Sequence, residues 1–199
     1  MPIQRRYTSA DLEGLSARRG ARIELLDGEI HISMPSHHGE HQAATQVVAL
    51  ALFQWCQHTR LGRSVMAPGV IFGPHDEVIP DTMWISRERF QHALNENGHL
   101  IVAPEIMVEV LAPDEGDERR VRELKHRIYS LFGVDEYWIV DWQQQEVQVF
   151  CRGDSTLELA ATLGYDDTLI SPLLPEFALR LADIWEAEPF PKWAIRSRA

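Results

Sequence analysis

Two acidic side chains lie against apolar runs that are typical of buried strands. Asp81 follows Pro80 and precedes the segment TMWIS, and Glu109 interrupts the segment IMVEVLA. A buried carboxylate is unfavourable unless a cation or a metal compensates it. Two such carboxylates at strand ends could converge on Mg²⁺, which takes one or two carboxylates, waters and phosphate oxygens. The alternatives are a turn residue for Asp81 and an arginine ion pair for Glu109.

Lys125 is a third candidate, because it lies on a predicted amphipathic helix at the edge of the apolar stripe. Tyr129 follows it by four residues, which is one helical turn. The side chain of Lys125 could extend to solvent, as lysines at such edges commonly do. It could instead turn towards Glu109, where an ammonium group can orient a nucleophile or stabilise developing negative charge. The sequence leaves both roles open.

The bulk composition is that of an ordinary globular domain. Of the 199 residues, 45% are hydrophobic and 25% charged, and the net charge is −11. This charge argues against broad, non-specific nucleic-acid binding but permits a local basic patch. The two cysteines, Cys56 and Cys151, form neither a disulfide framework nor a zinc motif. The first residues lack the apolar core of a secretion signal, and a reducing cytoplasm is the expected location.

The apolar periodicity predicts an alternation of helices and strands along the chain. A hairpin is expected around Asp27-Gly28, since this dipeptide suits a tight turn. The remaining elements are a short helix at 7–16, a long buried helix within 34–58, two strands within 64–86, a central strand at 105–113, an amphipathic helix at 114–134 that ends at Gly133, a strand pair at 135–152, a strand at 155–163, and a closing loop and helix within 171–190.

This order predicts one domain over residues 1–199 of the α/β (α+β) class, with a mixed central β-sheet flanked by helices. The amphipathic helix should place Val121, Leu124, Ile128, Leu131 and Phe132 against the sheet. Tyr137 and Trp138 are expected in the core. The basic run ERRVRELKHR is either a solvated helix face or a phosphate-contacting face.

The candidate residues together resemble a known motif. Pro80-Asp81, Glu109-Val110-Leu111 and Lys125 resemble the motif of the PD-(D/E)XK nuclease superfamily. More narrowly, the chain resembles the Uma-type restriction endonuclease family of bacteria, a domain of unknown function. The resemblance covers about residues 7–187 and leaves 188–199 as a loosely ordered tail. The matching stretches are IELLDGEI, MPSHHGEHQ, IPDTMWIS, PEIMVEVLAP, LKHRIYSLFGVDEYWIVDW and PLLPEFALRLADIW.

The resemblance implies a restriction-endonuclease-like core with an N-terminal helix and β-hairpin. It implies that Asp81, Glu109 and the backbone carbonyl of Val110 bind Mg²⁺ or Mn²⁺, and that metal-activated water hydrolyses a phosphodiester bond. Glu24 matches another recurring acid, which either completes the metal site or is a solvated hairpin charge. His41 matches a recurring histidine, which either contacts phosphate or makes a buried hydrogen bond. The expected phosphate contacts are Tyr129, Arg119, Arg122 and His41.

Departures from the superfamily pattern leave two functions open. The usual lysine two residues after the glutamate is replaced by Leu111, so Lys125 would take its role. The leading hypothesis is a metal-dependent endonuclease, acting on DNA as a homodimer or higher homo-oligomer. The alternative is a catalytically weak or inactive homodimeric module that binds a protein or a small ligand. The acidic net charge and Leu111 favour this second hypothesis.

Overall fold

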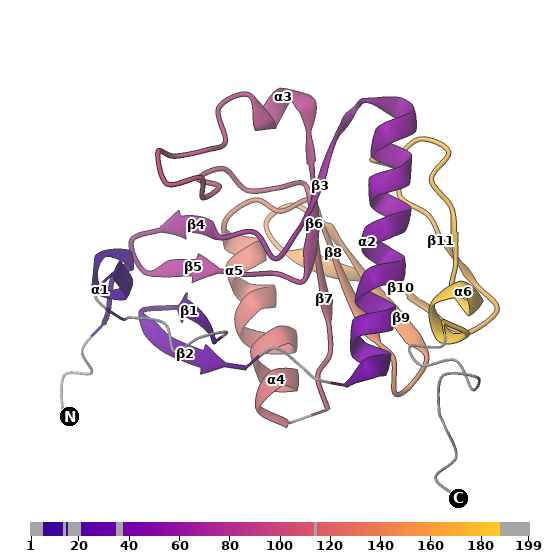
Figure 1. Cartoon of the computed structure of the whole chain (residues 1–199), viewed down its shortest axis with the longest axis horizontal. Helices are drawn as coiled ribbons and strands as arrows, with labels where there is room; N and C mark the ends of the chain where they lie inside the picture. The colour runs from indigo at the N-terminus through magenta and orange to yellow at the C-terminus, as the bar shows by residue number, and fades with distance from the viewer. Residues whose placement is uncertain (1–5, 14, 16–20, 35–37, 114, 188–199) are drawn as a thin grey trace, which may run out of the picture.

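A mixed six-stranded sheet forms the centre of the protein. The computed structural model describes residues 6–13, 15, 21–34, 38–113 and 115–187 (Figure 1). The strand order is β10-β9-β8-β7-β6-β3, in which β7 and β8 pair in parallel and the other neighbours pair antiparallel. The strands are β3 (Gly62–Met66), β6 (Thr82–Ser86), β7 (Ile106–Val110), β8 (Glu136–Asp141), β9 (Glu146–Arg152) and β10 (Leu157–Leu163).

A smaller sheet lies beside the larger one, in the order β2-β1-β5-β4. The predicted hairpin is confirmed, because Asp27 and Gly28 have φ values of 53° and 78°, as a tight primed turn requires. The strands of the smaller sheet are β1 (Arg22–Leu26), β2 (Glu29–Ser33), β4 (Val70–Gly73) and β5 (Asp76–Val78). The prediction of two strands within 64–86 is wrong, since β3, β4, β5 and β6 all occupy this segment.

The chain crosses from the smaller sheet to the larger one at Pro80-Asp81. Proline has no backbone N–H, so it cannot continue a ladder and the extended segment breaks there. β6 begins at the next residue, Thr82. Asp81 therefore lies at the junction of the two sheets, where its side chain can face both.

Helices cover both faces of the larger sheet (Figure 1). The long helix α2 (Gly39–Thr59) packs on one face, and its prediction is confirmed. The other face is covered by a continuous helical segment made of α4 (Glu115–Arg119), η1 (Arg120–Lys125) and α5 (His126–Leu131). Shorter elements complete the described chain: α1 (Ser9–Glu13), α3 (Arg87–Phe90), β11 (Thr168–Leu169), β12 (Leu179–Arg180) and α6 (Ala182–Trp185).

Strand alternation divides the core into two layers. Along β7, Ile106 and Val108 pack in the cluster with α2, whereas Met107 packs in the cluster with η1 and α5. On β8, Trp138 and Tyr137 alternate in the same way, and both are fully buried as predicted. Because both faces are covered, these two strands are mostly apolar, and Glu109 is the one acid within β7.

The helical segment over the second face departs from the predicted amphipathic helix. Its middle, η1, is a π-helix, which changes the register of the residues that follow. Leu131, predicted in the apolar stripe, is 74% exposed, and that prediction is wrong. Lys125, predicted at the edge of the stripe, is 1% exposed. Gly133 follows the helix with φ 85°, as expected for a residue that ends it.

The predicted tail, residues 188–199, lies outside the described residues. Within the described residues, no helix combines the length and the apolar character that crossing a membrane requires.

Glu136 provides a prediction about pH and stability. It is buried at the start of β8, where its carboxylate accepts hydrogen bonds from Ser171 Oγ at 2.8 Å and Trp138 Nε1 at 2.9 Å. Burial raises its pKa, although the two hydrogen bonds oppose this rise. Since the folded-state pKa lies above the unfolded value, Glu136 favours the folded state most below the unfolded pKa. That contribution is lost as pH rises through the folded pKa.

Glu136→Gln is therefore expected to raise the free energy of unfolding by roughly 1 kcal/mol at pH 8. The amide oxygen can still accept from Trp138, and the amide N–H can donate to Ser171. Denaturant unfolding from pH 4 to pH 8 should show this advantage shrinking towards acid pH. Glu158→Gln, at an exposed strand position, is the control and should show no such trend. A Glu136→Gln variant no more stable than the parent at pH 8 would contradict the prediction.

Candidate active site

The larger sheet brings Asp81 and Glu109 face to face. β6 and β7 are antiparallel neighbours in which Thr82 pairs with Val108. Continuing this register by one residue places Asp81 opposite Glu109, at the edge where β6 begins and β7 ends. The Val110 N–H donates to Asp81 Oδ2 at 2.9 Å, which joins the two segments there. Both acids are buried, with 3% and 2% exposure, so Asp81 is not a solvated turn residue.

Glu109 is held by two donors from the helix that covers this face of the sheet. Lys125 Nζ, at the end of η1, and the Tyr129 hydroxyl, on α5, donate to Glu109 Oε1 at 2.8 and 2.7 Å. Lys125 and Tyr129 are one helical turn apart, so both can reach the same oxygen. Within the described part of the chain, Glu109 Oε2 accepts no hydrogen bond, and its lone pairs can therefore serve a ligand.

Lys125 links Glu109 to a third acid, which comes from the smaller sheet. Its ammonium nitrogen lies 2.8 Å from Glu24 Oε1, 2.8 Å from Glu109 Oε1 and 3.5 Å from the Ile79 carbonyl oxygen. Glu24 Oε1 also accepts the Ile79 N–H at 2.7 Å, which ties β1 to the segment before Asp81. The three N–H bonds of Lys125 have protein oxygens as partners, so Lys125 fixes the positions of Glu24 and Glu109.

The charges in this group depend on one another. Burial raises the pKa of Glu109 to about 7; Lys125 opposes this rise, and the Asp81 and Glu24 carboxylates add to it. Burial alone would lower the pKa of Lys125, but Glu109 and Glu24 outweigh burial and raise it. Burial and the adjacent Glu109 raise the pKa of Tyr129 well above its ordinary value, so its hydroxyl stays protonated and donates. Such mutually perturbed groups are concentrated at functional sites.

Asp81 and Val110 have further partners from β1 and α2. The Arg22 guanidinium donates to Asp81 Oδ1 at 2.8 Å. The His41 Nε2–H donates to the Val110 carbonyl oxygen at 3.0 Å, and this nitrogen lies 3.9 Å from Asp81 Oδ2. His41 therefore makes the buried hydrogen bond that was one of its two expected roles. His41 Nδ1 is buried and has no partner among the described residues.

The π-helix adds Arg120 to the same group of charges. Arg120 pairs with Asp117, and its Nε lies 3.6 Å from Glu24 Oε2. Arg120 and Lys125 are five residues apart, and an α-helix of 3.6 residues per turn would point them in different directions. In a π-helix, whose hydrogen bonds join residues five apart, both side chains can reach Glu24. We call the whole group the charged cluster: Arg22, Glu24, Asp81, Glu109, Asp117, Arg120 and Lys125.

The donors at the charged cluster suit a hard divalent cation. Asp81, Glu109 and the Val110 carbonyl offer oxygen atoms, which Mg²⁺ and Mn²⁺ prefer. Among the described residues, no group of three or more His, Cys, Asp or Glu side chains forms a ready metal cage. A cation at Asp81 would share its carboxylate with Arg22 or displace that side chain.

Comparison of the chain with models of protein families identifies its family. Residues 9–182 match the model of the Uma2 family, which is described as "putative restriction endonuclease". The match spans most of the chain and includes every member of the charged cluster. The chain belongs to the Uma2 family. The resemblance seen in its motifs is thereby confirmed, while a search of curated proteins finds no significant match for this Uma2 chain.

Solved structures show that the Uma2 chain shares its fold with another protein. One matching crystal structure is described as a "putative nuclease belonging to DUF820" from Anabaena variabilis. The two have a TM-score of 0.72 and 20% sequence identity, and the match covers 89% of this chain and 97% of that one. The predicted fold class, a restriction-endonuclease-like α/β core with a mixed sheet, is confirmed.

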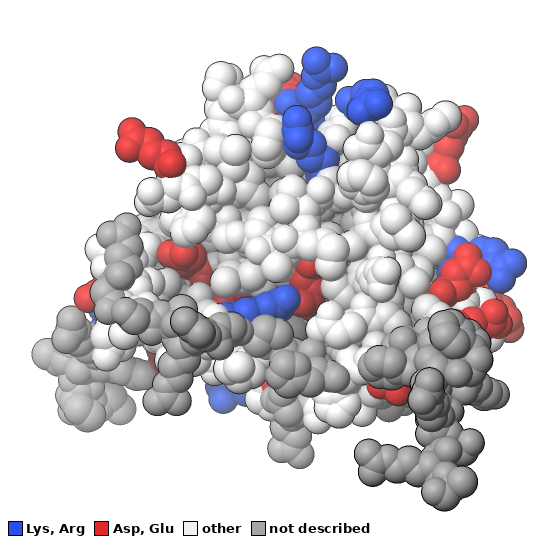
Figure 2. Space-filling view, in the orientation of Figure 1, with Lys and Arg blue, Asp and Glu red and all other residues white. Residues whose placement is uncertain are grey.

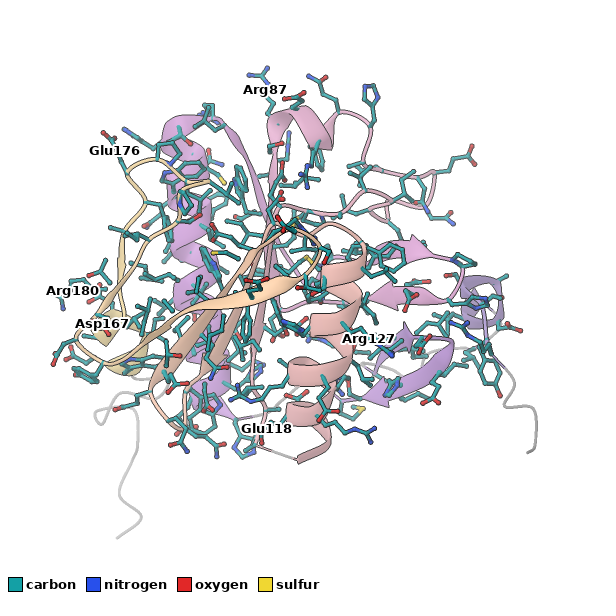
Figure 3. All side chains as sticks on the ribbon, turned by 180° about the vertical axis from the view of Figure 1, so that it is seen from behind. Arg87, Glu118, Arg127, Asp167, Glu176 and Arg180 are labelled. Carbon is teal, nitrogen blue, oxygen red and sulfur yellow. The ribbon has the colours of Figure 1, made fainter. Side chains whose placement is uncertain are left out.

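Two arginines predicted to contact phosphate lie outside the charged cluster of this Uma2 protein. Arg122 donates to Glu118 Oε1 at 2.9 Å and to Asp141 Oδ2 at 3.1 Å. Arg119 is exposed and lies 3.4 Å from Glu123 Oε2. Figure 3 shows Glu118 near the end of the helical segment that is distant from α5. The phosphate role of both arginines stays a prediction.

Three members of the charged cluster were not predicted from the Uma2 sequence, namely Arg22, Asp117 and Arg120. A usable signal existed for Arg22, because residues two apart on a strand face the same side and Arg22 precedes Glu24 by two. Glu24 itself faces the cluster rather than solvent, and only 1% of it is exposed. No comparable signal existed for Arg120, whose position depends on the π-helix.

Proposed function

We propose that this Uma2 protein is a metal-dependent endonuclease that hydrolyses phosphodiester bonds of DNA. The observation that carries the proposal is the pairing of Asp81 with Glu109 at the ends of two adjacent strands, with Lys125 bound to Glu109. The family description and the fold shared with another nuclease-like protein support the same reaction class. The charged cluster supplies oxygen donors, a buried ammonium and a guanidinium within one site.

In this proposal Asp81, Glu109 and the Val110 carbonyl hold Mg²⁺ or Mn²⁺. The metal, when bound, would lower the pKa of a water and neutralise charge on the phosphate. Asp81 is oriented by the Val110 N–H, and the Val110 carbonyl by His41. These contacts fix two ligands before any substrate arrives, which is how preorganised sites reduce the cost of binding.

The remaining residues of the cluster have supporting roles in this proposal. Lys125 and Tyr129 hold one oxygen of Glu109, leaving the other oxygen for the metal. Arg22 is 27% exposed at its side chain, so it can leave Asp81 and contact a phosphate oxygen of the substrate. Glu24 holds Lys125 in place from the other side. We also propose that the protein acts as a homodimer, since two-fold symmetry suits cleavage of both strands of a duplex.

The proposal is tested with a plasmid nicking assay in Mg²⁺, Mn²⁺, Ca²⁺ and EDTA. The parent protein should nick supercoiled DNA in Mg²⁺ or Mn²⁺ and not in EDTA. Asp81→Asn removes one carboxylate charge and should lower the rate at least about 100-fold, because metal-ligand charge stabilises the transition state. Asp183→Asn, on the exposed face of α6, is the matched control and should cut as fast as the parent. Equal cutting by Asp81→Asn and the parent would refute the mechanism.

A second function is favoured by the saturation of the charged cluster. Asp81, Glu24 and Glu109 each have a cationic partner within the protein. Leu111 also occupies the position where the superfamily usually has lysine. This arrangement is also what an inactive module that kept the fold would have. Titration calorimetry separates the two functions: heat of Mg²⁺ or Mn²⁺ binding that disappears in Asp81→Asn supports the nuclease. A folded parent without binding at millimolar metal supports the module.

A further inference from the structure

A groove at the far end of β6 from Asp81 gathers three arginines. It has a volume of about 440 Å³ and lies between the C-terminal end of α2, the edge strand β3 and the start of α3. Arg60, Arg63 and Arg87 line it together with the hydrogen-bonding side chains of Gln57 and Ser64, and no acidic residue lines it. Figure 2 shows basic side chains gathered over α3 and the end of α2, and Figure 3 labels Arg87 there.

These three arginines lack the acidic partners that all the other described arginines except Arg152 have. Arg60 donates to Gln57 Oε1 at 3.2 Å, Arg63 lies 4.9 Å from the centre of the Phe90 ring, and neither they nor Arg87 forms an ion pair in the described structure. Arg152 donates to main-chain carbonyls. The others contact carboxylates: Arg6, Arg22, Arg89, Arg119, Arg120, Arg122, Arg127 and Arg180.

This contrast is informative because the chain has a net charge of −11. Carboxylates are abundant on such a surface, and arginines placed at random would meet them. Three exposed arginines that face one groove without a carboxylate therefore create a local positive field in an acidic protein. Guanidinium groups and neutral hydrogen-bond donors together are the chemistry that recognises phosphate oxygens.

The backbone conformation of Arg60 is compatible with a functional side chain, although Ala67 and other residues also have positive φ. Arg60 follows α2 in the left-handed region, with φ 62° and ψ 17°. Glycine is the usual residue at this position, since a Cβ atom is unfavourable there. Retaining a strained residue is common where the side chain has a function. A positive charge at a helix C-terminus is also favourable in itself, but this benefit does not depend on whether the side chain lines a groove.

The groove lies in reach of a nucleic acid that occupies the charged cluster. Arg87 follows Asp81 by six residues along β6, and at about 3.4 Å per residue this corresponds to roughly 20 Å. A duplex advances by about 3.4 Å for each base pair, so this distance is about six base pairs. Figure 2 shows charged side chains of both signs lower on the same face, between the β1–β2 hairpin and α2.

We propose that Arg60, Arg63 and Arg87 bind the phosphate backbone of the DNA about six base pairs from the bond that is cut. This inference rests on the proposed nuclease function for its substrate. It assigns to the groove a role in affinity that the charged cluster does not perform. It also explains how an acidic protein attracts a polyanion, since binding needs only a local patch of cations.

Fluorescence anisotropy in EDTA tests the proposal without cleavage. The probes are labelled duplexes of about 8 and about 30 base pairs, of which only the longer reaches roughly 20 Å to either side of its centre. Arg60→Gly/Arg63→Ala/Arg87→Ala should bind the longer duplex at least about tenfold more weakly than the parent. The slope of log affinity against log salt should fall by about three, one for each phosphate contact. The short duplex can occupy the groove alone, so its binding should weaken as well.

Two controls separate a role in binding from general effects of charge and folding. Arg6→Ala/Arg127→Ala/Arg180→Ala removes the same charge from arginines that pair with Asp27 or Asp183, and it should bind both duplexes like the parent. Arg60→Gly alone relieves the left-handed strain, so it should have an equal or higher Tm and yet weaker binding. The triple Arg→Lys variant keeps the charges and should retain most of the salt slope.

The proposal is overturned if the arginine triple variant binds either duplex like the parent. It is also overturned if sedimentation shows that the triple change dissociates a dimer while DNA affinity is unchanged, because the groove would then hold a second copy. Its failure differs from that of the nuclease proposal. If nicking depends on Asp81 but not on the three arginines, only the groove proposal is refuted. If DNA binding depends on the arginines but no nicking occurs, only the nuclease proposal is refuted.

Discussion

Lys125→Met is expected to lower the free energy of unfolding by about 3–5 kcal/mol, because it breaks a buried ion pair by removing one partner. The Lys125 ammonium lies 2.8 Å from both Glu24 and Glu109, and each of the three residues is almost fully buried. Methionine fills a similar volume without a charge, so the loss reflects electrostatics rather than a cavity. Urea unfolding followed by circular dichroism measures the change.

The double variant Lys125→Met/Glu109→Gln distinguishes this mechanism from a general packing defect. Removing the Glu109 charge leaves Glu24, whose Oε2 still lies 3.6 Å from Arg120 Nε. The double variant should therefore recover at least about 1 kcal/mol relative to the single one. Arg127→Met, on the exposed side of α5, is the matched control and should cost less than about 0.5 kcal/mol. A single variant as stable as the parent would show that the ion pair does not hold the site together.

Glu109→Gln is expected to lower the rate of DNA nicking by about 1000-fold while the protein stays folded. The glutamine keeps an oxygen that accepts from Tyr129, and Lys125 retains Glu24 as its counter-charge. The fold therefore loses little, and its stability should remain within about 1 kcal/mol of the parent. The site loses a metal-binding charge and one of the two anchors of Lys125, so both metal affinity and catalysis should fall.

The nicking assay for Glu109→Gln is read beside two measurements of the same variant. Calorimetry should show weaker Mg²⁺ or Mn²⁺ binding, and urea unfolding should show the retained fold. Glu146→Gln makes the same substitution at the start of β9, outside the charged cluster, and should cut like the parent. If Glu109→Gln is fully active, Glu109 is a structural partner of Lys125 and no ligand. If it is inactive because it unfolds, the ion-pair account of Glu24 and Lys125 is wrong.

Local sequence patterns were sufficient for the strand that carries Glu109 and for a strand after Asp81, although they gave too few strands within 64–86. Proline before Asp81 marks the end of one ladder, and an apolar run broken by a single acid marks a central strand. The Asp27-Gly28 turn and the helical spacing of α2 were equally local signals. These features follow from backbone restrictions and periodicities of a few residues, so they can be read without knowing any distant contact.

The partners of those two acids could not be obtained in this way. Arg22 reaches Asp81 across 59 residues of sequence, and Glu24 meets Lys125 only because the smaller sheet folds against η1. Long-range pairings depend on how whole sheets and helices dock, which no local window contains. The exposure of Leu131 likewise follows from the π-helix, whose five-residue hydrogen bonds shift the register that a 3.6-residue period predicts.

The sequence by itself thus determined which residues could do chemistry and which strands and helices carry them. Tertiary structure alone decided that Lys125 is locked between two carboxylates and that Arg120 joins it on the same side of η1. It also decided that Arg60, Arg63 and Arg87 share one groove without an acid. The physical reason is that side-chain charges act over a few ångströms, and only the folded chain sets which charges come that close.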